Sequence, residues 1–254
     1  MNQHWNASTY DSSMAFVSKF GESLMDLLKP EPGEKIIDWG CGTGDLAAAI
    51  AAKGAEVTGI DASAEMIHTA RSKYPHLTFQ VADGQTFVAK TPVDAIFSNA
   101  ALHWLLDKHG AASSISASLK MNGRFIAEFG GDGNIASIVN VLPQAFAANG
   151  CSDKLFIPWY FPTIGEYTSL LEQYGLTVDL ALCFDRPTPL IIGDEGFQQW
   201  MNTFADGILS VLTPTERDGV IKYMEEELKP TLYQEDHWVM DYRRIRIAAY
   251  KREK

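Results

Sequence analysis

A glycine-rich run, Asp38-Trp39-Gly40-Cys41-Gly42-Thr43-Gly44, is the segment best suited to chemistry in this chain of 254 residues. The apolar pair Ile36-Ile37 precedes it, and the helix-like stretch Leu46-Ala47-Ala48-Ala49-Ile50 follows it. Glycines let the backbone approach a ligand closely, and the start of a helix presents N–H groups and a partial positive charge. The run therefore predicts a strand, a turn and a helix that bind a small molecule with an anionic or carboxylate group.

The run differs from two well-known glycine-rich turns, the dinucleotide-binding turn and the P-loop. A dinucleotide site needs G-x-G-x-x-G, and Asp45 stands where the third glycine is required. A P-loop needs a lysine after its last glycine, and none follows Gly44. An ordinary tight turn stays open from the run alone, so the neighbouring segments must decide.

Short β-rich runs alternate with helical patterns after Gly33. The expected strands are Lys35–Asp38, Ala55–Ile60, Leu77–Val81, Val93–Ser98 and Arg124–Phe129, and the expected helices are 44–53, 63–73 and 107–119. This alternation predicts βαβ units and a parallel sheet. Asp61 follows the second run, where a nucleotide-binding fold places the carboxylate that accepts hydrogen bonds from ribose hydroxyls.

The pattern changes beyond Phe129. Helical stretches at 135–148 and 165–174, separated by an aromatic loop at 156–162, predict a cap on the sheet. A strand at Thr177–Phe184, a helical insertion from about 194 to 229 and a strand at Trp238–Tyr250 are expected to follow. We expect one domain over 1–254, with an N-terminal lid (1–29), a binding core (30–130), a cap with insertions (131–235) and a final strand (236–251).

The glycines Gly40, Gly42 and Gly44 after Asp38, with Asp61 and Asp83 at later strand ends, resemble the class I S-adenosylmethionine (SAM) dependent methyltransferases. Softer similarities, around Tyr10, at 161–167 and at 241–246, resemble the branch that contains trans-aconitate 2-methyltransferase. The resemblance implies a Rossmann-like α/β fold with a mostly parallel seven-stranded sheet, helices on both faces and a helical cap. It also implies SAM as methyl donor, S-adenosyl-L-homocysteine as product and no metal.

The same resemblance implies which residues hold the cofactor. Asp61 would accept from the ribose, Asp83 from the adenine amino group, and the helix after Gly44 would face the methionine carboxylate. The full set is Tyr10, Asp38, Gly40, Cys41, Gly42, Gly44, Asp61, Ala62, Met66, Asp83, Gly84, Asn99 and Ala100. Tyr10 would belong to an N-terminal lid, or its helix would simply cover a sheet edge.

The methyl acceptor is expected beside His103 and Trp104, just after the fourth strand. His103 is a candidate base for a phenol, alcohol or amine; alternatively it stacks in the pocket wall or bonds the cofactor. A carboxylate acceptor is already a nucleophile at neutral pH and needs no base. The expected substrate-binding set is His103, Trp104, Trp159, Tyr160 and Arg244, with Phe161 beside them and with Trp200 and Phe204 at a spacing typical of core.

The final strand carries a run of arginines. Alternation places Tyr242, Arg244 and Arg246 on one face, with Arg243 and Ile245 on the other. An arginine that reached the acceptor would suit a carboxylate by bidentate geometry, whereas the alternative is a solvated basic edge.

Composition narrows the partners. The net charge of −11 is spread along the chain, which disfavours nucleic acid. The three irregularly spaced cysteines suggest neither a disulfide framework nor a zinc site, and indicate reduced thiols in a cytoplasm. No apolar run approaches the roughly 20 residues of a membrane helix. No heptad pattern or edge motif indicates an oligomeric state.

These observations favour a cytoplasmic, SAM-dependent methyltransferase of a small molecule, with a carboxylate oxygen as the preferred acceptor atom. The alternatives are a SAM-binding protein that does not transfer methyl groups, and an O- or N-methyltransferase of a natural-product intermediate. Methylation of macromolecules is disfavoured because Ser98-Asn99-Ala100-Ala101 stands where base-modifying relatives carry Asn/Asp-Pro-Pro-aromatic.

Overall fold

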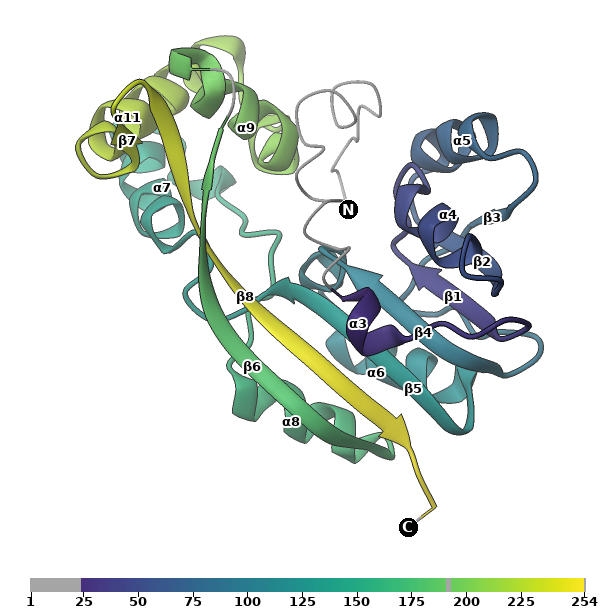
Figure 1. The fold of residues 1–254 in the computed structure, drawn as a ribbon. Coiled ribbons are helices and arrows are strands. Elements are labelled where there is room, and N and C mark those ends of the chain that lie inside the picture. Colours follow the sequence, from purple (N-terminus) through teal and green to yellow (C-terminus); the bar gives the residue numbers. More distant parts are fainter. Residues whose placement is uncertain (1–23, 191–192, 254) are drawn as a thin grey trace.

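An eight-stranded sheet runs through the described part of the chain, residues 24–190 and 193–253 of a computed structural model (Figure 1). The strands are β1 (Lys35–Trp39), β2 (Glu56–Asp61), β3 (Thr78–Val81), β4 (Val93–Asn99), β5 (Leu119–Gly130), β6 (Leu176–Pro189), β7 (Tyr233–Gln234) and β8 (His237–Lys251). The main path is β3-β2-β1-β4-β5-β8-β6, and the short β7 pairs with β8. The first five strands are parallel, whereas β8 is antiparallel to both neighbours. The expected α/β fold with a mostly parallel sheet is confirmed.

Helices cover both faces of this sheet because successive strand residues point to opposite sides. Ile36 of β1 packs with α3 (Met25–Leu28), α4 (Asp45–Ala51) and α5 (Ala64–Lys73), while Ile37 packs on the side of α6 (Lys108–Ser118). Both residues are almost fully buried. A strand that is buried on both faces reads as a continuous apolar run, which explains why the sequence pattern located β1 well.

The antiparallel pair β6 and β8 extends beyond the other strands of the sheet. Figure 1 shows it as a long ribbon that reaches the helices α7 (Ala136–Ala148), α9 (Gly196–Phe204) and α11 (Pro214–Leu232). The sequence pattern predicted β6 only as far as Phe184, because the polar and proline-containing segment 185–189 breaks the apolar run. Since β6 is an edge strand, it tolerates Pro187 and Pro189 and stays paired with β8 to its end.

The cap has a hydrophobic core of its own. Its buried side chains come from α7, α9, α10 (Asp206–Leu209), α11 and the outer half of β8. They include Ile138, Leu142, Phe146, Trp200, Val220, Met224 and Trp238. The short 3-10 helices η2 (Ser152–Lys154) and η3 (Gly193–Glu195) lie in the connections around it. Strand β8 therefore contributes to the cap cluster and to the apolar clusters on both faces of the sheet.

The helix expected at 165–174 packs differently from its prediction. As α8 (Ile164–Gln173) it lies against the sheet, where Tyr167 meets the ring of Phe129 with ring centroids 4.8 Å apart. Its start is fixed by a capping box between Thr163 and Glu166. The amphipathic face of α8 therefore covers the sheet and not the cap.

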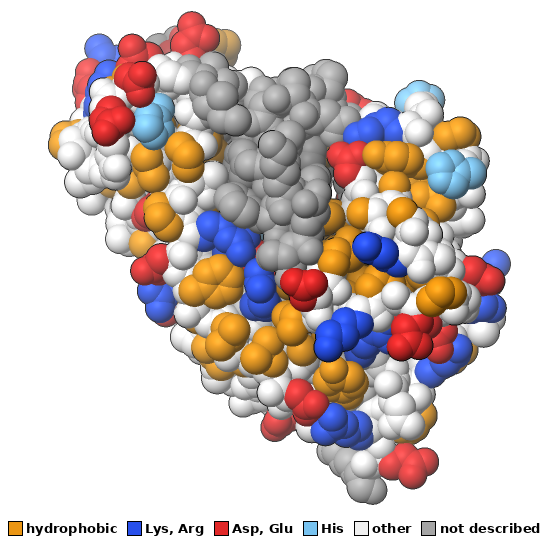
Figure 2. Space-filling model, viewed as in Figure 1, with side chains coloured by type: hydrophobic (Ala, Val, Ile, Leu, Met, Phe, Trp, Pro, Cys, Tyr) orange, Lys and Arg blue, Asp and Glu red, His pale blue; other side chains and the backbone are white. Residues whose placement is uncertain are grey.

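The surface carries charges of both signs. On the face shown in Figure 2, acidic and basic side chains are mixed with hydrophobic and uncharged ones. None of the described helices combines the length and the apolar character needed to cross a membrane.

A buried carboxylate ties β5 to the ribbon. Glu128 of β5 is 2% exposed, and it accepts a hydrogen bond from Arg246 Nε at 2.7 Å and pairs with Arg186 of β6. Both guanidinium groups also lie over the Phe184 ring. Because one buried carboxylate here pairs with two largely buried guanidinium groups, removing its charge breaks both ion pairs at once.

We expect Glu128→Gln to lower the free energy of unfolding by about 3–5 kcal/mol, since it breaks a buried ion-pair network. Urea denaturation followed by circular dichroism measures this. Glu226→Gln, which removes an exposed pair with Lys222 on α11, is the matched control and should leave stability unchanged. A loss below about 1 kcal/mol for Glu128→Gln would show that solvent compensates the arginines.

Candidate functional site

A cleft of about 370 Å³ lies over the carboxyl ends of β1, β2, β3 and β4. The chain leaves β1 toward β2 on one side and returns to β4 on the other, so the strand order reverses here. Ligands of open α/β sheets bind in such crevices. The described residues that line it are Trp39, Gly40, Gly42, Ile60, Asp61, Ala62, Met66, Ala82, Asp83, Gly84, Gln85, Asn99, Ala100, Ala101, Trp104 and Leu105.

Two glycines make the wall of this cleft possible. Gly40 has a φ of 81°, and a Cβ atom there would lie 2.2 Å from the Cβ of Ala101. A Cβ on Gly84 would lie 2.3 Å from Nε1 of Trp39, an indole nitrogen that is buried with no hydrogen-bond partner in the described structure. A side chain at either position would collide with Ala101 or Trp39, so glycine allows these parts of the cleft wall to pack closely.

Asp61 stands at the end of β2 and holds the glycine turn. One carboxylate oxygen accepts from the Gly42 amide at 3.0 Å, and the other accepts from the Ser63 amide at 2.8 Å. Burial raises the pKa of Asp61, although both backbone bonds oppose that shift. Because each carboxylate oxygen has two lone pairs, both oxygens retain capacity for a ligand hydroxyl.

Asp83 has a close partner that the sequence analysis missed. Its carboxylate accepts from the backbone amide of Gln85 at 2.9 Å and from Gln85 Nε2 at 3.0 Å. Gln85 also lines the cleft. The amide two residues after an aspartate is the donor of an Asx turn, so the Asp-Gly-Gln sequence was the available signal.

Three of the expected cofactor residues lie behind the cleft wall. Asp38 is 1% exposed, and burial, with a smaller contribution from the charge of Asp61, raises its pKa to about 7. Cys41 Sγ lies behind the turn, 2.8 Å from where a Cβ on Gly59 would stand. Gly44 precedes α4, with Phe79 against it. Tyr10 lies outside the described residues.

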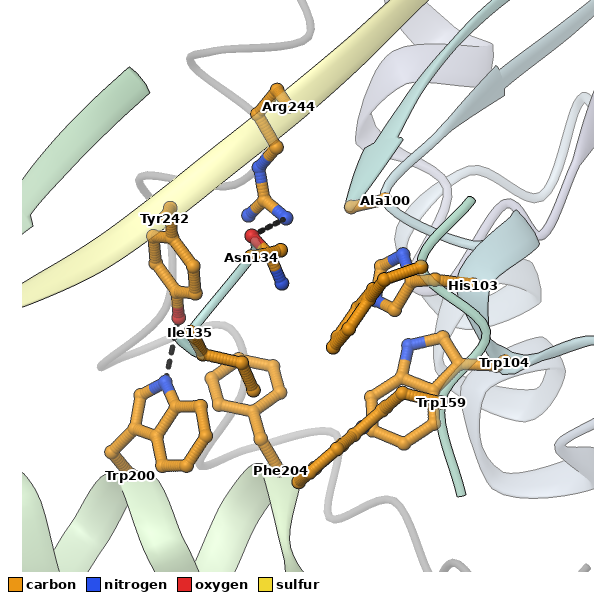
Figure 3. Close-up of a pocket in the computed structure, with 11 residues that line it drawn as sticks. Ala100, His103, Trp104, Asn134, Ile135, Trp159, Trp200, Phe204, Tyr242 and Arg244 are labelled. Atoms are coloured by element: carbon orange, nitrogen blue, oxygen red, sulfur yellow. Dashed lines mark hydrogen bonds between the residues drawn. The ribbon is translucent and has the colours of Figure 1, made fainter. Parts of the chain in front are cut away.

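A second, smaller pocket of about 50 Å³ adjoins the cleft and shares Ala100 and Trp104 with it (Figure 3). Ala100 follows β4 with a φ of 56°, and its amide donates to the Glu128 carbonyl at 2.7 Å, so the chain turns between the two spaces. The 3-10 helix η1 (Leu102–Trp104) comes next. The described lining residues are Ala100, His103, Trp104, Asn134, Ile135, Trp159, Phe161, Trp200, Phe204, Tyr242 and Arg244.

Arg244 is 8% exposed and lies in the wall of this pocket. Its guanidinium lies 4.3 Å from the centre of the Tyr242 ring and donates to Asn134 Oδ1 at 3.4 Å. The same Asn134 oxygen accepts from the Arg243 amide at 2.9 Å, and Tyr242 Oη accepts from Trp200 Nε1 at 2.6 Å. Asn134, on an irregular loop, carried no sequence signal.

The neighbouring arginines lie elsewhere. Arg243 points to the surface and pairs with Asp185, and Arg246 pairs with Glu128. The alternative of a solvated basic edge therefore describes Arg243 and not Arg244.

His103 is buried as a neutral ring. Its Nδ1 accepts from the Gly130 amide at 3.3 Å, so the ring proton sits on Nε2. Burial, and then the charge of Arg244, hold the pKa of His103 well below its usual range. The base role considered for His103 does not fit this geometry, because the neutral ring already uses its one accepting nitrogen.

The aromatic loop sends alternate side chains in opposite directions. Trp159 and Phe161 line the pocket, whereas Tyr160 turns to the other side of the extended segment and packs near Lys108. Unlike the other four members of the expected substrate-binding set, Tyr160 is not among the described residues that line this pocket. Trp200 and Phe204 belong to the cap core and line the pocket as well. Among the described residues, no group of three or more potential metal ligands comes together.

Comparison with known proteins finds methyltransferases among the relatives of this chain. A family model described as a methyltransferase domain matches residues 36–123. An uncharacterized methyltransferase of Schizosaccharomyces pombe is 29% identical over 261 residues, which cover 98% of each chain. A trans-aconitate 2-methyltransferase of Methylobacterium radiotolerans is 32% identical over 187 residues, 73% of this chain and 68% of that protein.

A solved structure shares the fold. Geranyl diphosphate C-methyltransferase from Streptomyces coelicolor, in complex with Mg²⁺, geranyl diphosphate and S-adenosyl-L-homocysteine, aligns with a TM-score of 0.55 at 18% identity. The alignment covers 92% of this chain and 79% of that chain.

We expect His103 to remain neutral between about pH 6 and pH 8, because burial and the Arg244 charge both disfavour its protonated form. The ¹⁵N chemical shifts of its ring should then stay constant over this range, with the proton on Nε2. Arg244→Met should move the pKa of His103 upward. A midpoint near the ordinary value of about 6.5 in the unmodified protein would contradict the buried, neutral ring.

Proposed function

The chain belongs to the SAM-dependent methyltransferases, and we propose that it transfers a methyl group to a carboxylate oxygen of a small-molecule acceptor. The family follows from the relative that is 32% identical over 73% of this chain. That relative is named for trans-aconitate, itself a carboxylic acid. The choice of a carboxylate rests mainly on the pocket beside the cleft.

The cleft residues fit the cofactor. SAM carries its methyl group on a sulfonium, which makes that group electrophilic. Asp61 would accept from the ribose hydroxyls with the lone pairs that Gly42 and Ser63 leave, and Asp83 with Gln85 would meet the adenine edge. The glycines at 40 and 84 allow the cleft wall that would face this ligand to pack closely against Ala101 and Trp39.

One observation carries the choice of acceptor: a buried guanidinium, that of Arg244, lies in the wall of the pocket next to the cleft. Asn134 and the ring of Tyr242 hold Arg244 in place. A guanidinium with fixed geometry pairs well with a carboxylate, and burial strengthens that pairing relative to water. An amine acceptor in its usual cationic form would be repelled at the same position.

The state of His103 supports the same conclusion. A phenol, alcohol or ammonium acceptor would need a group that removes a proton, and His103 offers no free lone pair. An ionised carboxylate needs no such group. If Arg244 holds one carboxylate oxygen, the other is left for attack, and the task of the protein is alignment, which can contribute several of the roughly 7–11 kcal/mol available from orientation. The neutral ester product loses its attraction to Arg244, which favours its release.

We expect Asp61→Ala to weaken binding of S-adenosyl-L-homocysteine by at least about 100-fold, because hydrogen bonds to a charged group contribute about 1.5–3 kcal/mol each. Titration calorimetry measures the affinity. Asp179→Ala, which removes a surface pair with Arg252, is the control and should bind normally. If the affinity of Asp61→Ala stays within about tenfold of the unmodified protein, the ribose assignment is wrong.

We expect Arg244→Met to raise KM for a carboxylate acceptor by at least about 100-fold, while binding of S-adenosyl-L-homocysteine stays unchanged. The assay follows transfer of a labelled methyl group from SAM to a panel of acids, phenols and amines, and tests whether the product is an alkali-labile ester. Arg243→Met removes the adjacent, surface-facing arginine and should leave KM unaltered. Labelled phenol ethers or methylamines in place of esters would overturn the proposed acceptor.

A further inference from the structure

The acceptor pocket is a narrow space between two aromatic walls. One wall contains Trp159 and Phe161, whose rings are nearly parallel at 15°, together with Trp104 at 6.1 Å from Trp159. The facing wall contains Tyr242 and the pair Trp200 and Phe204, 5.5 Å apart. In Figure 3, Arg244 points into the space between them. A group that enters this pocket therefore meets ring surfaces on both sides.

The lining of the space selects for shape. Most of this lining is aromatic ring surface. Flat groups with π electrons gain from stacked or edge contacts with such rings, whereas a puckered saturated group of the same carbon count is thicker. A planar group is thus the better match to the walls.

The cationic side chain in the pocket wall favours an acceptor that carries one carboxylate group. Arg244 is the one permanently cationic side chain among the described residues that line the pocket. A second or third carboxylate on the acceptor would have to leave water without a second permanent cation from this set, which is costly. The pocket in this respect favours a monocarboxylate over a tricarboxylate such as trans-aconitate.

Building on the proposed function, we infer that the acceptor is a planar monocarboxylate, in which the carboxyl group is conjugated with a double bond or an aromatic ring. Arg244 holds the carboxylate, and the aromatic walls hold the flat group attached to it. The methyl group passes from the sulfonium of SAM to one carboxylate oxygen. The C–S bond breaks with its electron pair on sulfur, an ester C–O bond forms, and neutral S-adenosyl-L-homocysteine leaves.

The test compares acids of equal charge and carbon number that differ in planarity. Benzoate is set against cyclohexanecarboxylate, and crotonate against butanoate, with trans-aconitate as the tricarboxylate, all with the full chain and labelled SAM. We expect kcat/KM about tenfold higher for benzoate than for cyclohexanecarboxylate, which corresponds to about 1.4 kcal/mol. We expect trans-aconitate to be at least about 100-fold poorer than benzoate.

Variants at Trp159 test whether its aromatic ring causes the preference for benzoate over cyclohexanecarboxylate. Trp159→Leu should reduce the benzoate preference to within about twofold, and Trp159→Phe, which keeps a ring, should preserve most of it. Calorimetry with S-adenosyl-L-homocysteine shows whether each variant retains a folded cofactor site. If Trp159→Leu loses that binding, the comparison of acids by the unmodified protein decides alone.

The outcomes separate the two proposals. Esters formed equally well from the saturated acids, or best from trans-aconitate, would overturn the planar monocarboxylate while leaving carboxylate methylation standing. No ester from any acid, despite normal cofactor binding and methylation of a phenol or amine, would overturn the proposed function together with this inference.

Discussion

Glu128 links the two halves of the site. Its backbone carbonyl accepts a hydrogen bond from the amide of Ala100, a residue that lines both the cleft and the smaller pocket. Its carboxylate holds Arg246 of β8 and Arg186 of β6. The turn after β4 and the ribbon that carries Arg244 are therefore positioned from one buried residue. A shift of this carboxylate would move the pocket wall relative to the cleft. The buried charge therefore serves two purposes: it pairs with the two arginines, and it positions the pocket wall.

The two halves are built in different ways. The cleft comes from consecutive strand ends between residues 36 and 123, the range that the methyltransferase domain model matches. Backbone approach decides its shape, as at Gly40 against Ala101. The smaller pocket, which we propose binds the acceptor, combines residues of a loop, a cap helix and the last strand. Changes in the cap can alter this pocket while the cleft stays the same, which is a physical route to different acceptors on one fold.

The burial of His103 and Arg244 determines which chemistry the pocket can support. The charge of Arg244 and the loss of water both keep His103 neutral, and the Gly130 amide then occupies its accepting nitrogen. A pocket of this kind cannot easily remove a proton, but it can hold an anion. Orientation of an acceptor that is already nucleophilic is the form of catalysis that such residues support.

The sequence by itself determined the fold class, the order of the central elements and the cluster of Gly40, Gly42, Asp61 and Asp83, because each of these depends on local spacing and on the shared edge of parallel strand ends. It could not determine the acceptor pocket. Asn134 and Trp200 are far from Arg244 along the chain. The pairing of β8 with β5 brings Asn134 to Arg244, and the contact of α9 with Tyr242 of β8 brings Trp200 to the same pocket. The tertiary structure also determined the direction of the Tyr160 side chain and the packing of α8. An extended loop alternates its side chains between two sides, and an amphipathic helix can cover either a sheet or a cap. Local patterns fix what an element is, while long-range packing fixes what it faces.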